Sequence, residues 1–340
     1  MAKRRRIRWD RVIITAAILI GLIFLFGSCV HSCTKRASEE SSLGSPLDPL
    51  GSQNSQTSKL PDSRTVPEES SAAPALPADY QEIAMPAAAL YKGNLVLIDD
   101  AHPSRIVNEE IDISSKKNTQ FDSVKKELDL VKVYDAADRA DCYQLSYPGN
   151  TYLNRTALTQ FNRLMTAYYA VTQNKDILFN YAFLTSGKQE KFLPDSATGL
   201  DIQLHLHMDN GRFGFITNTS PYSWIFEHMD SFGFIVRYPE DKSAQTGSKG
   251  SWSAIRYVGV PHSLYMTQNH LCLEEYLSLL RTSYTFGQGM LDFTSNDQSY
   301  RMYFVPANQT GDTNVPVPTN YAYEVSGNNI DGFVVTVFLK

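Results

Sequence analysis

Residues 200–208, LDIQLHLHM, alternate between apolar and polar side chains, which is the pattern of a β-strand with one buried face. Residues 154–174 instead place their apolar side chains at helical spacing, which predicts a long amphipathic helix. Similar patterns predict strands at 94–100, 177–184, 233–239 and 255–260, and helices at 221–232 and 271–281. Since helices and strands interleave without a regular βαβ repeat, we expect an α+β fold.

The N-terminus combines a basic cluster, residues 1–11, with an uncharged apolar run, residues 12–30. A run of this length can cross a hydrocarbon core of ~30 Å as a helix, and the basic cluster should stay on the cytoplasmic side. A cleaved signal peptide is the alternative, but its apolar region is usually shorter and ends at a small-residue site, which is not evident here. The sequence FGSC before Cys29 only loosely resembles a lipoprotein processing site. We therefore expect an uncleaved, single-pass transmembrane anchor.

Residues 31–79 are rich in Ser, Pro, Glu and Gln and contain no aromatic residue. Such a segment cannot bury enough apolar surface to offset its loss of conformational entropy, so we expect a disordered linker. The formal net charge of the chain is −5, and no basic face of the kind that binds nucleic acid is evident.

The rest of the chain resembles the VanY-type zinc D-alanyl-D-alanine carboxypeptidases, which act on bacterial cell-wall peptides. The resemblance covers about residues 93–281 and rests on short phrases that occur in the same order: GNLVLIDDAHP, TSG, TGL, WIFEH, GFIVRYPEDK, RYVGVPH and LEEYL. It implies a VanY- and hedgehog-like core at 80–282, with a small central antiparallel sheet flanked by helices. It also implies a C-terminal β extension at 283–340, packed on the same domain, and an extracytoplasmic location at a bacterial cytoplasmic membrane.

The same resemblance implies a catalytic zinc ion, but this sequence lacks the residues that would hold it. In the family, His and Asp of S-x-H-x-x-G-x-x-x-D and His of E-x-W-H bind the metal, and the Glu is the general base. Aligned on Gly199 and on the RYVG phrase, those positions are occupied by Ser196, Gln203, Ala254 and, for the base, Ser251. Shifting the second motif by one residue to match Trp252 places Gly250 and Ser253 there instead, and neither alignment restores a ligand or a base. The arginine that binds the substrate carboxylate is replaced by Gln189. We therefore expect a protein without catalytic residues or cofactor, a pseudoenzyme.

An alternative metal site remains open at the alternating strand. Asp201, His205 and His207 share one face of that strand and could provide zinc ligands if the site has moved along the chain. The simpler interpretation is that these residues line its solvated side, with Ile202, Leu204, Leu206 and Met208 facing the core.

The framework phrases also contain candidate binding residues: Thr198, Arg237, Arg256, Tyr257 and His262. The two arginines could instead anchor backbone or carboxylate groups within the fold, and His262 could be a hydrogen-bonded structural residue. Cys142 and Cys272 could form a disulfide, although the sequence does not place them at bonding distance.

Two classes of function follow from these observations. The first is a membrane-anchored, non-catalytic module that binds a peptidoglycan stem peptide or an envelope protein. The second is an active zinc carboxypeptidase, with relocated ligands, that trims stem peptides.

Overall fold

The computed structural model describes residues 76–107, 119–136, 139–183, 197–208 and 211–339, all of which belong to one compact unit, Ser70–Lys340. The predicted anchor, residues 12–30, lies outside these ranges, as does the predicted linker up to residue 75. Within the described ranges, no helix combines the length and the apolar character that a membrane crossing requires.

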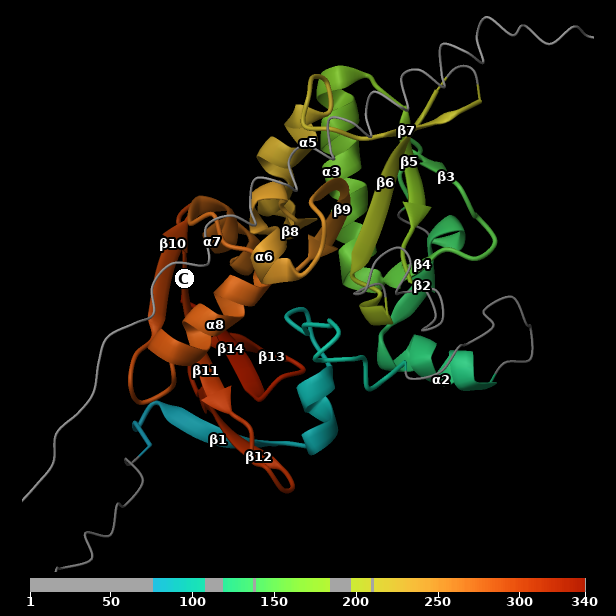
Figure 1. The fold of residues 1–340 in the computed structure, drawn as a ribbon. Helices are drawn as coiled ribbons and strands as arrows, with labels where there is room; N and C mark the ends of the chain where they lie inside the picture. The colour runs from blue at the N-terminus through green and yellow to red at the C-terminus, as the bar shows by residue number, and fades with distance from the viewer. Residues whose placement is uncertain (1–75, 108–118, 137–138, 184–196, 209–210, 340) are drawn as a thin grey trace, which may run out of the picture. The chain divides into compact units, whose positions relative to one another are not determined.

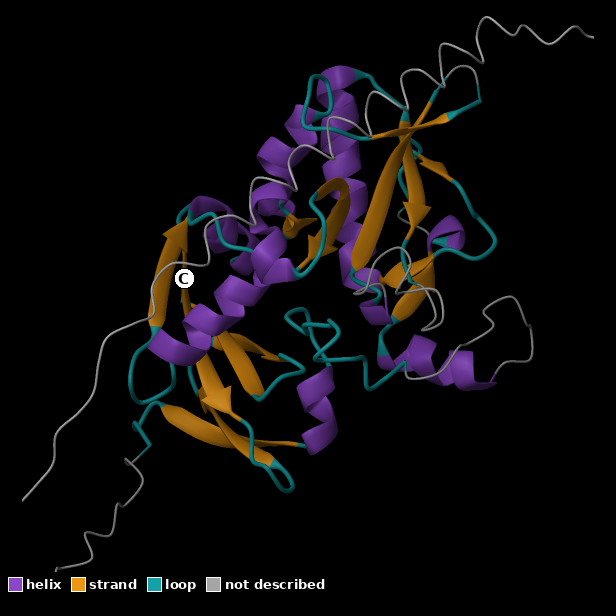
Figure 2. Cartoon of the chain, in the orientation of Figure 1, coloured by secondary structure: helices purple, strands orange, loops and turns teal. Residues whose placement is uncertain are grey.

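A central sheet carries the segments that the sequence singled out (Figure 1). Its strands, in sheet order, are β3 (Gln144–Leu145), β5 (Ile177–Tyr181), β6 (Asp201–His207), β9 (Ser251–Tyr257) and β8 (Phe234–Tyr238), and β7 (Phe213–Phe215) pairs with β6. The other pairs are antiparallel, but β3 and β5 are parallel. The expectation of an antiparallel sheet is therefore wrong at this edge, because the chain leaves β3, crosses over through β4 and α3, and re-enters the sheet as β5 in the same direction. The α+β assignment agrees with the mixed helices and strands of the structure (Figure 2).

One face of the central sheet is covered by α3 (Arg155–Thr172) and α5 (Ser223–His228). The predicted helix at 154–174 is confirmed as α3, and it begins after Asn154, whose side chain accepts hydrogen bonds from the amides of Thr156 and Ala157. Its apolar stripe packs with Ile202 and Leu204 of β6, which are buried as the alternation predicts. Two residues at the ends of this predicted strand differ from the prediction in their burial. Met208 is exposed because it follows the end of β6, and Asp201 is buried on the face that we expected to be solvated.

The C-terminal part of the chain forms a second sheet, with the order β10 (Leu291–Ser295), β11 (Gln298–Pro306), β14 (Gly332–Phe338) and β13 (Ala322–Gly327). Alternate residues of β11 and β14 face opposite sides. On one side they pack against α8 (Leu273–Ser283), and on the other against the ribbon of β1 (Tyr80–Met85) and β12 (Thr313–Pro318). The first described strand therefore pairs with the C-terminal segment rather than with the central sheet.

The remaining elements connect these layers. They are η1 (Ala87–Tyr91), α2 (Thr119–Glu127), β2 (Leu130–Lys132), η2 (Val133–Asp135), β4 (Tyr152–Asn154), η4 (Met229–Phe232), η5 (Glu240–Lys242), α6 (Ser243–Thr246) and α7 (His262–Gln268). The predicted helix at 221–232 is thus divided into α5 and the 3-10 turn η4, and the predicted strand at 255–260 is β9, which begins earlier, at Ser251.

The strand predicted at 94–100 is wrong. Leu95, Val96, Leu97 and Ile98 are buried as the apolar run suggests, but the segment joins no sheet. Its backbone groups bond elsewhere: the amide of Leu95 donates to Ser326 Oγ, and the amide of Leu97 donates to the Asn328 carbonyl. Because its hydrogen bonds are satisfied by distant residues, a buried segment can be apolar here without being a strand.

Arg256 joins this segment to the central sheet. Its guanidinium group is fully buried; Nη1 donates to Asp201 Oδ2 at 2.9 Å, and Nη2 donates to the carbonyls of Asn94 and Val96 at 3.3 and 2.9 Å. Asp201 and Arg256 face each other directly across β6 and β9. Asp201 also accepts a hydrogen bond from Thr198 Oγ1. One buried ion pair thus holds the turn before β6, two central strands and the 94–98 segment.

We predict that Arg256→Met lowers the Tm of the purified full-length chain by roughly 10 °C, because Asp201 would be left buried without a counter-ion. The matched control is Arg301→Met, which breaks the partly exposed pair of Arg301 with Asp292 and should cost only a few degrees at most. Thermal melting of both variants measures the difference, and equal losses would contradict a special role for the buried pair.

Candidate functional site

The turn before β6, residues 197–200, has a conformation that depends on glycine. Gly199 has a φ of +69°, and a Cβ atom there would lie 2.3 Å from Leu130 Cδ2. The hydroxyl of Thr198 donates to Asp201 Oδ2 at 2.8 Å and accepts from the amide of Leu200 at 3.1 Å. The TGL phrase therefore fixes the geometry with which the chain enters β6.

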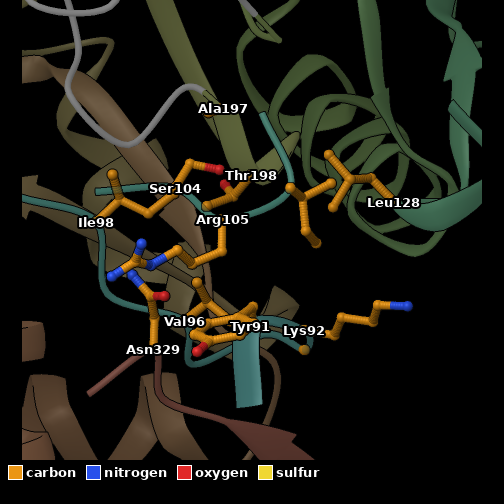
Figure 3. A pocket seen from close by; sticks show the side chains of 12 residues that line it. Tyr91, Lys92, Val96, Ile98, Ser104, Arg105, Leu128, Ala197, Thr198 and Asn329 are labelled. Atoms are coloured by element: carbon orange, nitrogen blue, oxygen red, sulfur yellow. The ribbon is translucent and has the colours of Figure 1, made fainter. Parts of the chain in front are cut away.

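A small pocket lies beside this turn. Figure 3 shows Thr198 and Ser104 on one side and Val96 and the ring of Tyr91 on the other, with Arg105 reaching across toward Asn329. Asn329 is already engaged, since its Nδ2 donates to the Leu97 and His102 carbonyls. The pocket therefore places Thr198 next to a cationic side chain, although no other sequence-predicted site residue lines it.

The two positions that align with metal ligands on β6 and β9 lie next to each other. Gln203 and Ala254 are direct partners in the antiparallel register of these strands, and side chains at such positions stand about 5 Å apart. Gln203 Oε1 accepts a hydrogen bond from Asn180 Nδ2 of β5 at 3.2 Å, and Ala254 is buried against Tyr238. Ser251 lies opposite Tyr238 in the β8–β9 pairing. Two of the positions that the resemblance assigns to metal ligands are thus neighbours on adjacent strands, where an amide and a methyl group stand.

These side chains do not fit the zinc ion that the family resemblance implies. Zinc sites in proteins use imidazole, thiolate or carboxylate ligands, whereas Gln203 offers an amide that is already hydrogen-bonded and Ala254 offers no donor atom. The other aligned positions, Ser196 and Gln189, lie outside the described residues.

The structure places the alternative ligands on β6 but does not bring them together. Asp201 is bound to Arg256, and the ring of His205 contacts the ring of Phe215 on β7. Burial lowers the pKa of His205, so its neutral form is favoured. Among the described residues, no three His, Cys, Asp or Glu side chains are arranged to hold a metal ion.

The candidate binding residues are buried rather than gathered on a surface. Arg237 forms a bidentate pair with Glu274 of α8, and His262 lies between Tyr276 Oη and Thr336 Oγ1 at 2.7 and 2.9 Å. Complete burial lowers the pKa of His262 to about 3, and burial raises the pKa of Tyr257 to about 12. These groups therefore act inside the fold, and a dissolved peptide has no direct access to Arg237, Arg256 or His262.

Two residues at these contacts, Asn180 and Glu274, were not predicted from the sequence. Asn180 is a polar residue inside a buried strand, and Glu274 belongs to the LEEYL phrase, so the sequence marks each residue as unusual. Their hydrogen-bond partners, Gln203 and Arg237, are far along the chain and cannot be identified from the local sequence. The proposed bond between Cys142 and Cys272 is absent, because both are free thiols in different parts of the core.

Comparisons with known proteins identify relatives of this chain. No protein-family model matches the chain. A D-alanyl-D-alanine carboxypeptidase of Enterococcus faecium is 30% identical over 268 residues, which cover 73% of this chain and 76% of that protein. VanXYC of Enterococcus gallinarum, a bifunctional D-Ala-D-Ala dipeptidase and carboxypeptidase, is 48% identical over 52 residues, 15% of this chain and 27% of its own.

Among solved structures, the vancomycin-resistance D,D-dipeptidase VanXYg, in complex with a D-Ala-D-Ala phosphinate analogue, has a similar fold. Its TM-score is 0.59 at 24% identity, and the match covers 76% of this chain and 99% of VanXYg. The extent of the match to the Enterococcus faecium enzyme, together with this shared fold, identifies the chain as a member of the VanX- and VanY-type D-alanyl-D-alanine carboxypeptidase family.

Proposed function

We propose that this protein is a membrane-anchored, extracytoplasmic member of the carboxypeptidase family that does not hydrolyse peptides and instead binds a peptidoglycan stem peptide or an envelope protein. The observation that carries this proposal is the pairing of Gln203 with Ala254 at the positions of two family metal ligands. Without a metal-activated water or a Glu-like base at Ser251, hydrolysis lacks both of its usual sources of a nucleophile.

The amides at this position suit binding better than hydrolysis. Gln203 is half-buried, and its amide, positioned by the hydrogen bond from the buried Asn180, can pair with the backbone of a peptide without changing its covalent structure. The family relationship supports a D-Ala-D-Ala peptide as the ligand. Binding should be weak, since neither a metal ion nor an arginine at position 189 is available to hold the terminal carboxylate.

We predict that a pentapeptide ending in D-Ala-D-Ala stays intact when it is incubated with the purified full-length chain, with or without added zinc. NMR of the peptide measures both parts of the proposal: no free D-alanine appears, and the D-Ala methyl signals receive saturation transfer from the protein. Asn180→Ala combined with Gln203→Ala should abolish that transfer.

The Enterococcus faecium carboxypeptidase serves as the positive control for hydrolysis. Chelator-sensitive release of D-alanine by our chain would overturn the non-catalytic proposal, and its loss in His205→Ala or His207→Ala would assign a relocated zinc site. Intact peptide without saturation transfer would exclude stem-peptide binding and leave the envelope protein as the ligand.

The proposed topology rests on the basic cluster 1–11 and the apolar run 12–30. We predict that a protease added to wall-stripped cells removes the domain that follows residue 80 and leaves a short membrane-bound fragment. Immunoblotting against a C-terminal epitope measures the loss, with a cytoplasmic protein as the control for intact cells. A protected domain would show that the orientation is wrong.

A further inference from the structure

A groove of about 480 Å³ lies beside β8, and Gln203, Ala254 and Asn180 do not line it. Its volume falls within the range of small-ligand sites in proteins. The apolar part of the lining comes from several elements: Phe226 of α5, Ile235 and Val236 of β8, Trp252 of β9, and Met266 and Leu271 in and after α7. Phe226 and Trp252 contact each other edge to face with ring centroids 5.0 Å apart, so a rigid aromatic pair forms part of the wall.

The charges in this groove are predominantly negative. Glu227, Glu240 and Asp241 line it, are exposed, and form no ion pair with a described residue. The lysine in the lining, Lys242, does not neutralise them, because its ammonium group is bound to Glu275 at 2.9 Å. The groove therefore presents free carboxylates next to an apolar surface.

The wall of the groove also includes β8, which is at the end of the central sheet order; within the described residues its strand partner is β9 alone. The residues of β8 other than Val236 are buried, so side chains rather than an open sheet edge form this part of the groove.

We propose that this groove binds a basic peptide segment whose apolar side chains pack on Trp252 and Phe226 and whose cationic side chains pair with Glu227, Glu240 and Asp241. The charge complementarity distinguishes this ligand from an acidic or a purely apolar one. The site is separate from the Gln203–Ala254 position, so it gives the domain a second binding function that does not depend on stem-peptide binding.

The test uses the full-length chain and a fluorescein-labelled peptide, acetyl-Leu-Lys-Leu-Lys-amide, with binding followed by fluorescence anisotropy. We expect saturable binding that weakens as salt rises. Matched probes replace each Lys with Glu, which should abolish binding, or each Leu with Ser, which should weaken it at least tenfold because the apolar contact is lost.

The triple variant Glu227→Gln, Glu240→Gln, Asp241→Asn should weaken binding of the Lys probe by about tenfold, as expected for the loss of three exposed ion pairs. The matched control, Asp100→Asn, Asp297→Asn, Asp312→Asn, changes the net charge equally at exposed sites outside the groove and should leave the affinity unchanged. If both triple variants bound the Lys probe equally weakly, the net charge of the protein would explain the loss of affinity, and the proposal would be overturned. Equal binding of the Lys and Glu probes would overturn it too.

Discussion

The buried contact between Arg256 and Asp201 connects parts of the chain that have little else in common. One guanidinium group satisfies a carboxylate on the neighbouring strand and two carbonyls of a segment that belongs to no sheet. Because a buried charge is stable only when it is paired and hydrogen-bonded, this arrangement requires β6, β9 and the 94–98 segment to be in place together. The turn at Gly199, held through Thr198, is positioned by the same contact.

Under our proposal, this framework lets the family fold persist in a chain that has lost the family's metal ligands. The positions that would carry ligands lie two residues from the buried pair, at Gln203 and Ala254, and do not take part in it. The amide and the methyl group at these positions make none of the contacts of the buried pair. The stability of the scaffold and the chemistry of the site thus depend on different side chains of the same two strands. The acidic groove beside β8 is lined by a third set of side chains.

Local patterns in the sequence predicted the elements whose burial is decided by their own periodicity, such as α3 and the apolar face of β6. These local patterns gave wrong predictions where residues far along the chain determine burial and hydrogen bonding. The 94–98 segment is apolar enough for a strand, but Arg256 and Ser326 provide its hydrogen bonds, and neither partner is visible in a local window. Asp201 is buried for the same reason. The ligand positions were located by family phrases, whereas the role of Asn180 beside Gln203 required the β5–β6 pairing.

The central claim, that the scaffold keeps the geometry of a metal site without its ligands, is tested most directly by zinc uptake after the ligands are restored. The variant Ser196→His, Gln203→Asp, Ala254→His, with Ser251→Glu as the base, should bind about one zinc ion per chain in equilibrium dialysis, because three ligands and a water complete a catalytic zinc site. The unmodified chain, dialysed in parallel, should retain far less. Tight stoichiometric zinc in the unmodified chain, or none in the restored variant of a folded protein, would contradict this account.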